Sequence, residues 1–342
     1  MTVSDTKTCV FAGAGFSAPF GHPTMDNFLR FTDSSPRLSE EDKLFLGRLV
    51  LEARRANSFL ESSPTNLEDI LTFSEMADRL GLVKQQESRG LEFRKIIQKI
   101  YTTPVPAEKY WEQYKPLGRL LGVGPKEWRA GISFVTTNYD LNIESACLSF
   151  GKKTNPGFNL LPQTSLGLNP IDFLYGESGV PLFKLHGSVN WFPCSQDPQI
   201  TIENRVVQVH RGPNDNGKLF LPLPCASNYQ PPDNPLIIPP SFLKPDLSTT
   251  MQTVWSGAAK ALSLANVVIF IGYSFPTSDT AMMYLLARAF SENAGLRKIY
   301  VIDPEAEKLV ARMRTPESKV GSHFRKLLIP ISQDWTNVGR IE

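Results

Sequence analysis

The sequence predicts an α/β protein: a Rossmann-like parallel sheet with helices on both faces, plus a helical insertion. Three observations lead to this fold class. Short apolar runs of strand length end abruptly in glycine or in clusters of polar residues. Two of these runs lead into stretches with a helical pattern, at 141–150 and 280–290. Between the first run and the second, residues 39–121 carry apolar residues at helical spacing.

The first apolar run, residues 8–11, leads into a glycine-rich turn. Gly13, Ala14, Gly15 and Ser17 lie in a GxGxxA pattern, in which the bare backbone approaches the phosphates of a dinucleotide. Two prolines and a further glycine follow within a few residues and exclude a long helix, so we expect a loop over a ligand. By itself the pattern also fits a tight structural turn.

The helical segment 39–121 takes the place of a short connection between the first two strands. We expect it to pack over the mouth of the ligand site. Its apolar residues form two stripes at helical spacing, Leu67, Ile70, Leu71, Ala77 and Leu80 in one and Phe93, Ile96, Ile97 and Ile100 in the other.

The second apolar run, residues 132–135, ends in a polar cluster that contains Thr137, Asn138 and Asp140. Polar residues at the carboxyl end of a buried strand lie where open α/β sheets bind their ligands. Asp140 has an alternative use, because aspartate commonly caps a helix and a helix is predicted to follow. Asn138 lies further from that helix, which favours a ligand contact.

The third motif, FKLHGS at 183–188, places His186 after a predicted strand and before a glycine. Histidine is the side chain best suited to accept a proton near neutral pH. An isolated histidine in an apolar strand is more often a core residue, but two ligand-facing motifs precede this one. Three other histidines lack such surroundings and are predicted to lie on the surface or in loops: His22, His210 and His323.

The fourth motif follows the clearest strand of the chain, residues 266–271. Gly272 and Ser274 come directly after it and are candidates to hold phosphate or ribose hydroxyl groups. Ser278 or Asp279 is predicted to cap the helix 280–290 and not to contact a ligand.

A further strand, residues 298–302, ends in Asp303. An acidic residue at this point can bind a ribose hydroxyl group. It can equally be a turn residue before the proline that follows.

Composition restricts the class of protein. The 342-residue chain is 41% hydrophobic and has a net charge of +2, which gives no reason to expect nucleic-acid binding. The longest apolar run is far shorter than the roughly 20 residues that cross a membrane, and no secretion signal begins the chain. Four cysteines without such a signal suggest a reducing cytoplasm.

The four motifs, FAGAGFSAPFGHPT, FVTTNYD, FKLHGS and VVIFIGYSFPTSD, together resemble the sirtuin superfamily. They are more similar to its bacterial, NAD-consuming, defence-type branch than to its protein deacylases. The resemblance implies a catalytic, NAD-binding domain made of residues 1–30 and 131–342, with 31–130 as the helical insertion. By motif it assigns catalysis to Asn138 and His186, and NAD binding to Gly13, Ala14, Gly15, Ser17, Asp140, Gly272 and Ser274; Thr137 and Asp303 are added from their places at strand ends.

Departures from the deacylase pattern accompany these matches. Deacylases carry GIPDFR where this chain has GHPTMD at 21–26, and TQNID where it has TTNYD. They also hold zinc with two CxxC pairs. The four cysteines here form no CxxC pair, so no zinc or other metal is expected: Cys9, Cys147, Cys194 and Cys225.

These expectations describe an NAD⁺ glycohydrolase that releases nicotinamide and ADP-ribose, as an antiphage effector that depletes NAD when triggered. Two alternatives stay open: an NAD-dependent protein deacylase, and an NAD- or ADP-ribose-binding subunit that is active only within a complex. The resemblance also implies a homo-oligomer and a partner protein such as a HerA-type ATPase. The sequence does not identify the trigger.

Overall fold

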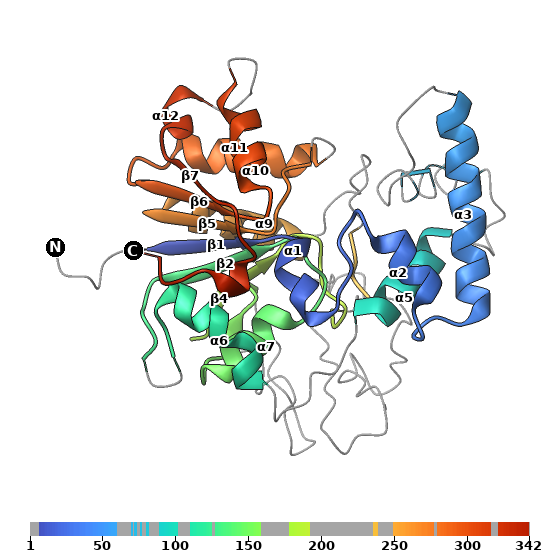
Figure 1. Ribbon diagram of the computed structural model, residues 1–342, viewed down its shortest axis with the longest axis horizontal. Coiled ribbons are helices and arrows are strands. Elements are labelled where there is room, and N and C mark those ends of the chain that lie inside the picture. The colour runs from blue at the N-terminus through green and yellow to red at the C-terminus, as the bar shows by residue number, and fades with distance from the viewer. Residues whose placement is uncertain are drawn as a thin grey trace.

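A parallel β-sheet forms the centre of the structure (Figure 1). The computed structural model describes residues 7–59, 70, 72–73, 76, 80–81, 89–101, 110–124, 127–158, 178–191, 235–238, 249–276, 279–315 and 321–341. Within them seven strands are all parallel, in the order β3-β4-β2-β1-β5-β6-β7. The strands are β1 (Thr8–Ala12), β2 (Ile132–Thr136), β3 (Thr154–Asn155), β4 (Val180–Lys184), β5 (Val267–Ile271), β6 (Lys298–Ile302) and β7 (Leu328–Ile331).

The register of the sheet aligns the carboxyl ends of its central strands. Ala12, the last residue of β1, pairs with Thr136 of β2 on one side and with Ile271 of β5 on the other. The next strand outward, β4, pairs its last residue, Lys184, with Thr136. Because the strands end together, the loops that follow them meet at one edge of the sheet.

Alternation along the strands produces two apolar faces, each covered by helices (Figure 1). On one face Phe11 and Phe270 belong to a core cluster with α9, α10 and α11. On the other face Val10 and Ile269 belong to a cluster with α6 and α7. The helices of these layers are α6 (Tyr110–Leu121), α7 (Asn142–Ser149), α9 (Thr249–Ser263), α10 (Thr280–Ser291), α11 (Ala306–Arg314) and α12 (Ser322–Arg325).

A third cluster lies beyond the carboxyl ends of the strands (Figure 1). It consists of α2 (Phe28–Ser34), α3 (Glu40–Phe59) and α5 (Arg89–Tyr101). The cluster also includes Tyr139 and Val189, which come from the loops that follow β2 and β4. The helical segment is therefore packed directly onto the edge of the sheet where those loops gather.

The predicted fold class is correct. The strands predicted at 8–11, 132–135, 266–271 and 298–302 and the helices predicted at 141–150 and 280–290 differ from the observed bounds by at most one residue. The stripe of Phe93, Ile96, Ile97 and Ile100 is buried as predicted. In the other stripe Ile70 is buried, but Leu80 is 61% exposed, so the prediction for Leu80 was wrong; Leu67, Leu71 and Ala77 lie outside the described residues. No helix of the described part is long and apolar enough to cross a membrane.

Candidate active site

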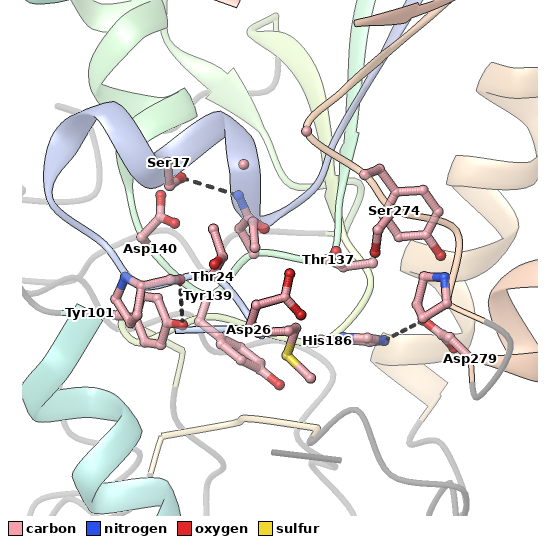
Figure 2. Close-up of a pocket in the computed structure, with 18 of the residues that line it drawn as sticks. Ser17, Thr24, Asp26, Tyr101, Thr137, Tyr139, Asp140, His186, Ser274 and Asp279 are labelled. Atoms are coloured by element: carbon pink, nitrogen blue, oxygen red, sulfur yellow. Dashed lines mark hydrogen bonds and ion pairs between the residues drawn. The ribbon is translucent and has the colours of Figure 1, made fainter. Parts of the chain in front are cut away.

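A cavity of about 200 Å³ opens where the central strands end. Figure 2 shows side chains from distant parts of the chain around this space. Ten of the eleven residues predicted for the site line the cavity; Gly13 does not. The predicted residues that line it are Ala14, Gly15, Ser17, Thr137, Asn138, Asp140, His186, Gly272, Ser274 and Asp303.

The glycine-rich turn after β1 packs against the turn after β5. The Gly13 N–H donates to the carbonyl oxygen of Ile271, and the Gly15 N–H donates to that of Gly272, both at 2.9 Å. A Cβ atom on Gly13 would lie 2.5 Å from the oxygen of Gly272, and one on Gly15 would lie 2.7 Å from the Cα of Gly272. These two N–H groups are thus used within the protein and not held free for phosphate, as the sequence had suggested; the glycines are required by the contact between the loops.

A short helix, which was not predicted, begins within this turn, and the predicted loop follows it. The helix α1 (Ala14–Ser17) is followed by the 3₁₀ turn η2 (Ala18–Phe20). Beyond it four residues that were not predicted for the site line the cavity: Pro23, Thr24, Met25 and Asp26.

Asn138 is buried and its amide orientation is determined by its partners. Its Nδ2 atom donates to the carbonyl oxygen of Gly13 at 2.9 Å and to the hydroxyl of Ser17 at 3.1 Å. A carbonyl oxygen can only accept, so the atom facing Gly13 must be the nitrogen. Both N–H bonds are then occupied, and Oδ1 is left as the atom through which Asn138 can act on a ligand.

The carboxylate of Asp140 has one oxygen bound and one without a partner. Its Oδ1 accepts from the N–H of Asn142 at 2.9 Å, at the first residue of α7. Its Oδ2 is buried and has no hydrogen-bond partner in the described structure. Asp140 therefore serves the start of the helix, as the alternative reading held, and also offers a buried acceptor at the cavity.

His186 lies two residues beyond β4 and faces a buried carboxylate. Its Nε2 atom is 3.6 Å from Oδ2 of Asp279, and both side chains are 3% exposed (Figure 2). Asp279 also caps α10, because its Oδ1 accepts from the N–H of Met282 at 3.3 Å. The prediction that Asp279 caps this helix is confirmed. The sequence did not predict a place for Asp279 in the ligand site, but its side chain lines the cavity.

The helical segment contributes one wall of the cavity through Ile97 and Tyr101. The Tyr101 hydroxyl donates to the carbonyl oxygen of Pro23 at 3.3 Å, and its ring stacks on His22 with 5.5 Å between centroids. Burial raises the pKa of Tyr101, and the charge of Asp140 raises it further. Tyr101 thus connects the helical segment to the loop beside the cavity.

His22 lies in a loop, which agrees with the prediction of a surface or loop position, but its side chain is buried. Its side chain is buried under Tyr101, a residue 79 positions away in the chain that sequence reasoning could not place there. Burial lowers the pKa of His22, an effect that Asp140 opposes and Arg37 assists. His323 is exposed as predicted, and His210 lies outside the described residues.

A buried ion pair anchors the loop that carries Asn138 and Asp140. Lys184 Nζ lies 3.0 Å from Glu144 Oε1, with side chains 1% and 0% exposed. The same ammonium group donates to the carbonyl oxygens of Tyr139 and Asp140. Sequence reasoning missed Lys184; the available signal was a lysine placed inside an otherwise apolar strand.

Comparison with known proteins identifies the family. The SIR2-like domain matches residues 132–321, more than half of the chain. The chain belongs to the SIR2-like family. It is thus a member of the sirtuin-like superfamily, whose proteins use NAD.

Solved structures of Sir2 proteins are similar to this chain at low identity. A mutant Sir2 homologue in complex with 2′-O-acetyl ADP ribose has a TM-score of 0.41 and 16% identity, over 98% of this chain and 90% of the other. A second mutant homologue, with ADP ribose, has a TM-score of 0.41 and 15% identity over the same shares. Sir2 bound to an inhibitor, 2′-O-acetyl-ADP-ribose and a deacetylated peptide has a TM-score of 0.33 and 14% identity, over 96% and 89%. Among curated protein sequences none matches.

The described cysteines of this SIR2-like protein are unsuited to metal binding. Cys9 and Cys147 are buried, and burial raises the pKa of the Cys9 thiol to about 12 and that of Cys147 as well. A thiol must lose its proton to bind zinc. No group of three or more potential metal ligands occurs in the described ranges. Cys194 and Cys225 lie outside those ranges, so the absence of zinc stays a prediction.

Proposed function

We propose that this SIR2-like protein is an NAD⁺ glycohydrolase that releases nicotinamide and ADP-ribose. The hydrogen bonding of Asn138 supports this proposal most strongly. Two hydrogen bonds fix its amide, and its oxygen remains for a ligand in a cavity that His186 also lines. An oriented acceptor and a potential general base in one buried space are the groups that attack by water requires.

The chemistry of the leaving group explains why an oriented acceptor and a general base are enough for this reaction. Nicotinamide in NAD⁺ is a cationic pyridinium, so it departs as a neutral molecule without a general acid. The bond from ribose C1′ to the pyridinium nitrogen breaks with its electron pair moving to the nitrogen, and an oxocarbenium-like ribose develops. Water bonds to C1′ from the opposite face as that bond breaks. Asn138 Oδ1 accepts a hydrogen bond from this water, and His186 takes up the proton that the water loses.

The polar groups of the cavity suit the nicotinamide end of NAD⁺. The unpartnered Oδ2 of Asp140 can accept from the N–H₂ group of the carboxamide. The described residues that line the cavity include the carboxylates of Asp26, Asp140, Asp279 and Asp303 but no lysine or arginine. Such a lining favours the cationic pyridinium over its neutral product.

Ser17 supports the placement of a ligand oxygen. Its hydroxyl accepts from Asn138 Nδ2, so its own proton is directed to another acceptor. With Ser274 and Asp303 at the ends of the neighbouring strands, it is suited to bind ribose or phosphate groups. The same cavity is lined by Ala14, Gly15, Thr137 and Gly272.

Hydrolysis is favoured over deacylation by residues that line the cavity. Where the deacylase pattern has aspartate, phenylalanine and arginine, this chain has Thr24, Met25 and Asp26, and all three face the site. The NAD-cleaving Asn138 and His186 are retained. The deacylase alternative predicts acetyl-ADP-ribose as a product, formed only when an acyl-lysine peptide is present.

The biological setting belongs to the same proposal. The motifs resemble those of bacterial defence-type NAD hydrolases, which supports a cytoplasmic antiphage effector that depletes NAD. A free NAD hydrolase would harm its own cell, so control by self-association or by a partner such as a HerA-type ATPase is part of the proposal.

The proposal is tested by incubating the purified protein with NAD⁺ and measuring nicotinamide and ADP-ribose by chromatography. We expect His186→Ala to lose at least about 100-fold in rate. His323→Ala, which changes an exposed histidine of α12, serves as the matched control and should keep the rate. Equal turnover by the His186→Ala protein would refute the assignment. If NAD⁺ stabilises the protein thermally but is not consumed, the alternative function is favoured, in which the chain is an NAD-binding subunit that is active only within a complex.

A further inference from the structure

We propose that Asp279 is the positioning residue of the site, which fixes the orientation and tautomer of His186. The inference rests on the proposed function, because His186 is the base of that reaction. The sequence suggested for Asp279 only the cap of α10. The structure brings its carboxylate to the imidazole from a different strand-to-helix connection.

The two oxygens of Asp279 have separate partners. Oδ1 accepts from the Met282 N–H at the start of α10, at 3.3 Å, which ties the carboxylate to a 12-residue helix. Oδ2 is directed at His186 Nε2, 3.6 Å away (Figure 2). Both side chains are 3% exposed, so little water competes for the contact. The N-terminal end of α10 also favours a negative charge at this position.

A carboxylate dictates which imidazole nitrogen carries the proton. An ionised carboxylate can only accept, so neutral His186 is expected to carry its proton on Nε2, and its lone pair is then on Nδ1. At 3.6 Å the pair is an electrostatic contact and not yet a hydrogen bond. Contacts of this kind commonly shorten when substrate fills a site. After water loses its proton to Nδ1, the imidazolium ion faces the negative charge of Asp279.

The other ionisable groups around the cavity do not duplicate this role. The carboxylates of Asp26, Asp140 and Asp303 and the phenols of Tyr101, Tyr139 and Tyr273 also line it. Asp140 Oδ1 accepts from the start of α7, and Asp303 Oδ1 accepts from the N–H of Glu305. The nearest described cation along β4, Lys184, is paired with Glu144.

The variant Asp279→Asn separates the cap from the charge. Asparagine caps helices about as well as aspartate, so its Oδ1 can keep the bond from Met282. Its N–H₂ group then faces Nε2 of His186, and a donor at this place favours the opposite tautomer, with the proton on Nδ1. The matched control is Asp334→Asn: Asp334 caps the 3₁₀ turn η6 (Trp335–Asn337), with Oδ1 accepting from the N–H of Thr336 at 2.9 Å.

Two readouts test the proposal. Nitrogen-15 NMR of the ring, assigned by the signals that His186→Gln lacks, should show neutral His186 protonated on Nε2 in the unchanged protein and on Nδ1 in Asp279→Asn. Steady-state kinetics with NAD⁺ should show kcat reduced by about 10²- to 10⁴-fold in Asp279→Asn with KM nearly unchanged, and Asp334→Asn unaffected.

A proton on Nδ1 of His186 in the unchanged protein would overturn the inference, as would a kcat for folded Asp279→Asn within about threefold of the original. The tautomer of His186 in the unchanged protein is measured without NAD⁺ turnover. If the unchanged protein consumes no NAD⁺, the proposed hydrolysis fails while the tautomer still decides the role of Asp279.

Discussion

Asn138 donates through Nδ2 to the carbonyl oxygen of Gly13 at 2.9 Å and so joins the loop after β2 to the loop after β1. These loops lie 125 positions apart in the chain and meet because their strands are paired in register. The turn after β5 completes the junction through Gly272, which contacts Gly13 and Gly15. The geometry of the candidate site therefore depends on close contact among three strand ends.

Gly13→Ala should disturb this junction. The added methyl group would meet Gly272 and Tyr273 within 3 Å, and the contact is with backbone atoms that cannot move aside cheaply. We expect a loss of stability of roughly 1–3 kcal/mol and loss of NAD turnover. Gly47→Ala is the matched control, since Gly47 lies within α3 with nothing within 4 Å of the added atom. That variant should gain up to about 1 kcal/mol by helix propensity. Urea unfolding of both proteins measures the difference, and equal stability of the two would contradict this explanation.

Lys184→Met should destabilise the protein by about 3–5 kcal/mol, because it leaves the buried carboxylate of Glu144 without its partner. Replacing Glu144 by leucine in the same protein should restore much of that loss. Lys43→Met breaks the surface pair with Glu40, and should change stability by less than about 1 kcal/mol. Denaturant midpoints decide between these outcomes. A cost for Lys184→Met no greater than for Lys43→Met would show that the buried pair does not hold the loop.

His22 should make the protein less stable in mild acid. Burial lowers its pKa from the ordinary value of 6.5, so the unfolded chain takes up a proton at a higher pH than the folded chain. Above the pKa of the unfolded chain, the contribution of His22 to stability is independent of pH. As the pH drops through 6.5 towards the pKa of the folded chain, stability falls. Urea midpoints should therefore decrease over that window. His22→Phe, which keeps a ring against Tyr101, should flatten the decrease, whereas His323→Phe should not. Equal slopes in all three proteins would exclude His22 as the cause.

Features encoded in contiguous residues were predictable from the sequence. The buried strands appear as apolar runs, and the polar residues at their ends line the cavity because parallel strands that pair in register end together. The stripe on α5 was correct because helix period alone determines which residues share a face. The strand β7 was not predicted; it is short, lies at the sheet edge and contains Pro330, which an edge strand tolerates.

Features that depend on distant partners were not predictable. Asp279 appeared as a helix cap, and its second role became visible only when the fold placed His186 beside it. The burial of His22 was not predicted, because Tyr101, which stacks on it, belongs to α5 and lies far away in the chain. The glycines of the first turn were predicted to bind NAD, but the structure shows that they are needed for the close contact with Gly272. The division into residues 1–30 with 131–342 and the insertion 31–130 stays a prediction.

The proposed hydrolysis depends on the oxygen of Asn138, which directs water at NAD⁺. NAD⁺ binding by calorimetry and nicotinamide release by rapid quench are measured side by side for the unchanged protein and for Asn138→Ala. We predict that both bind NAD⁺ with Kd within about tenfold of each other and that Asn138→Ala releases nicotinamide at least about 100-fold more slowly. Nicotinamide release by Asn138→Ala at the original rate would show that the oxygen of Asn138 does not direct water.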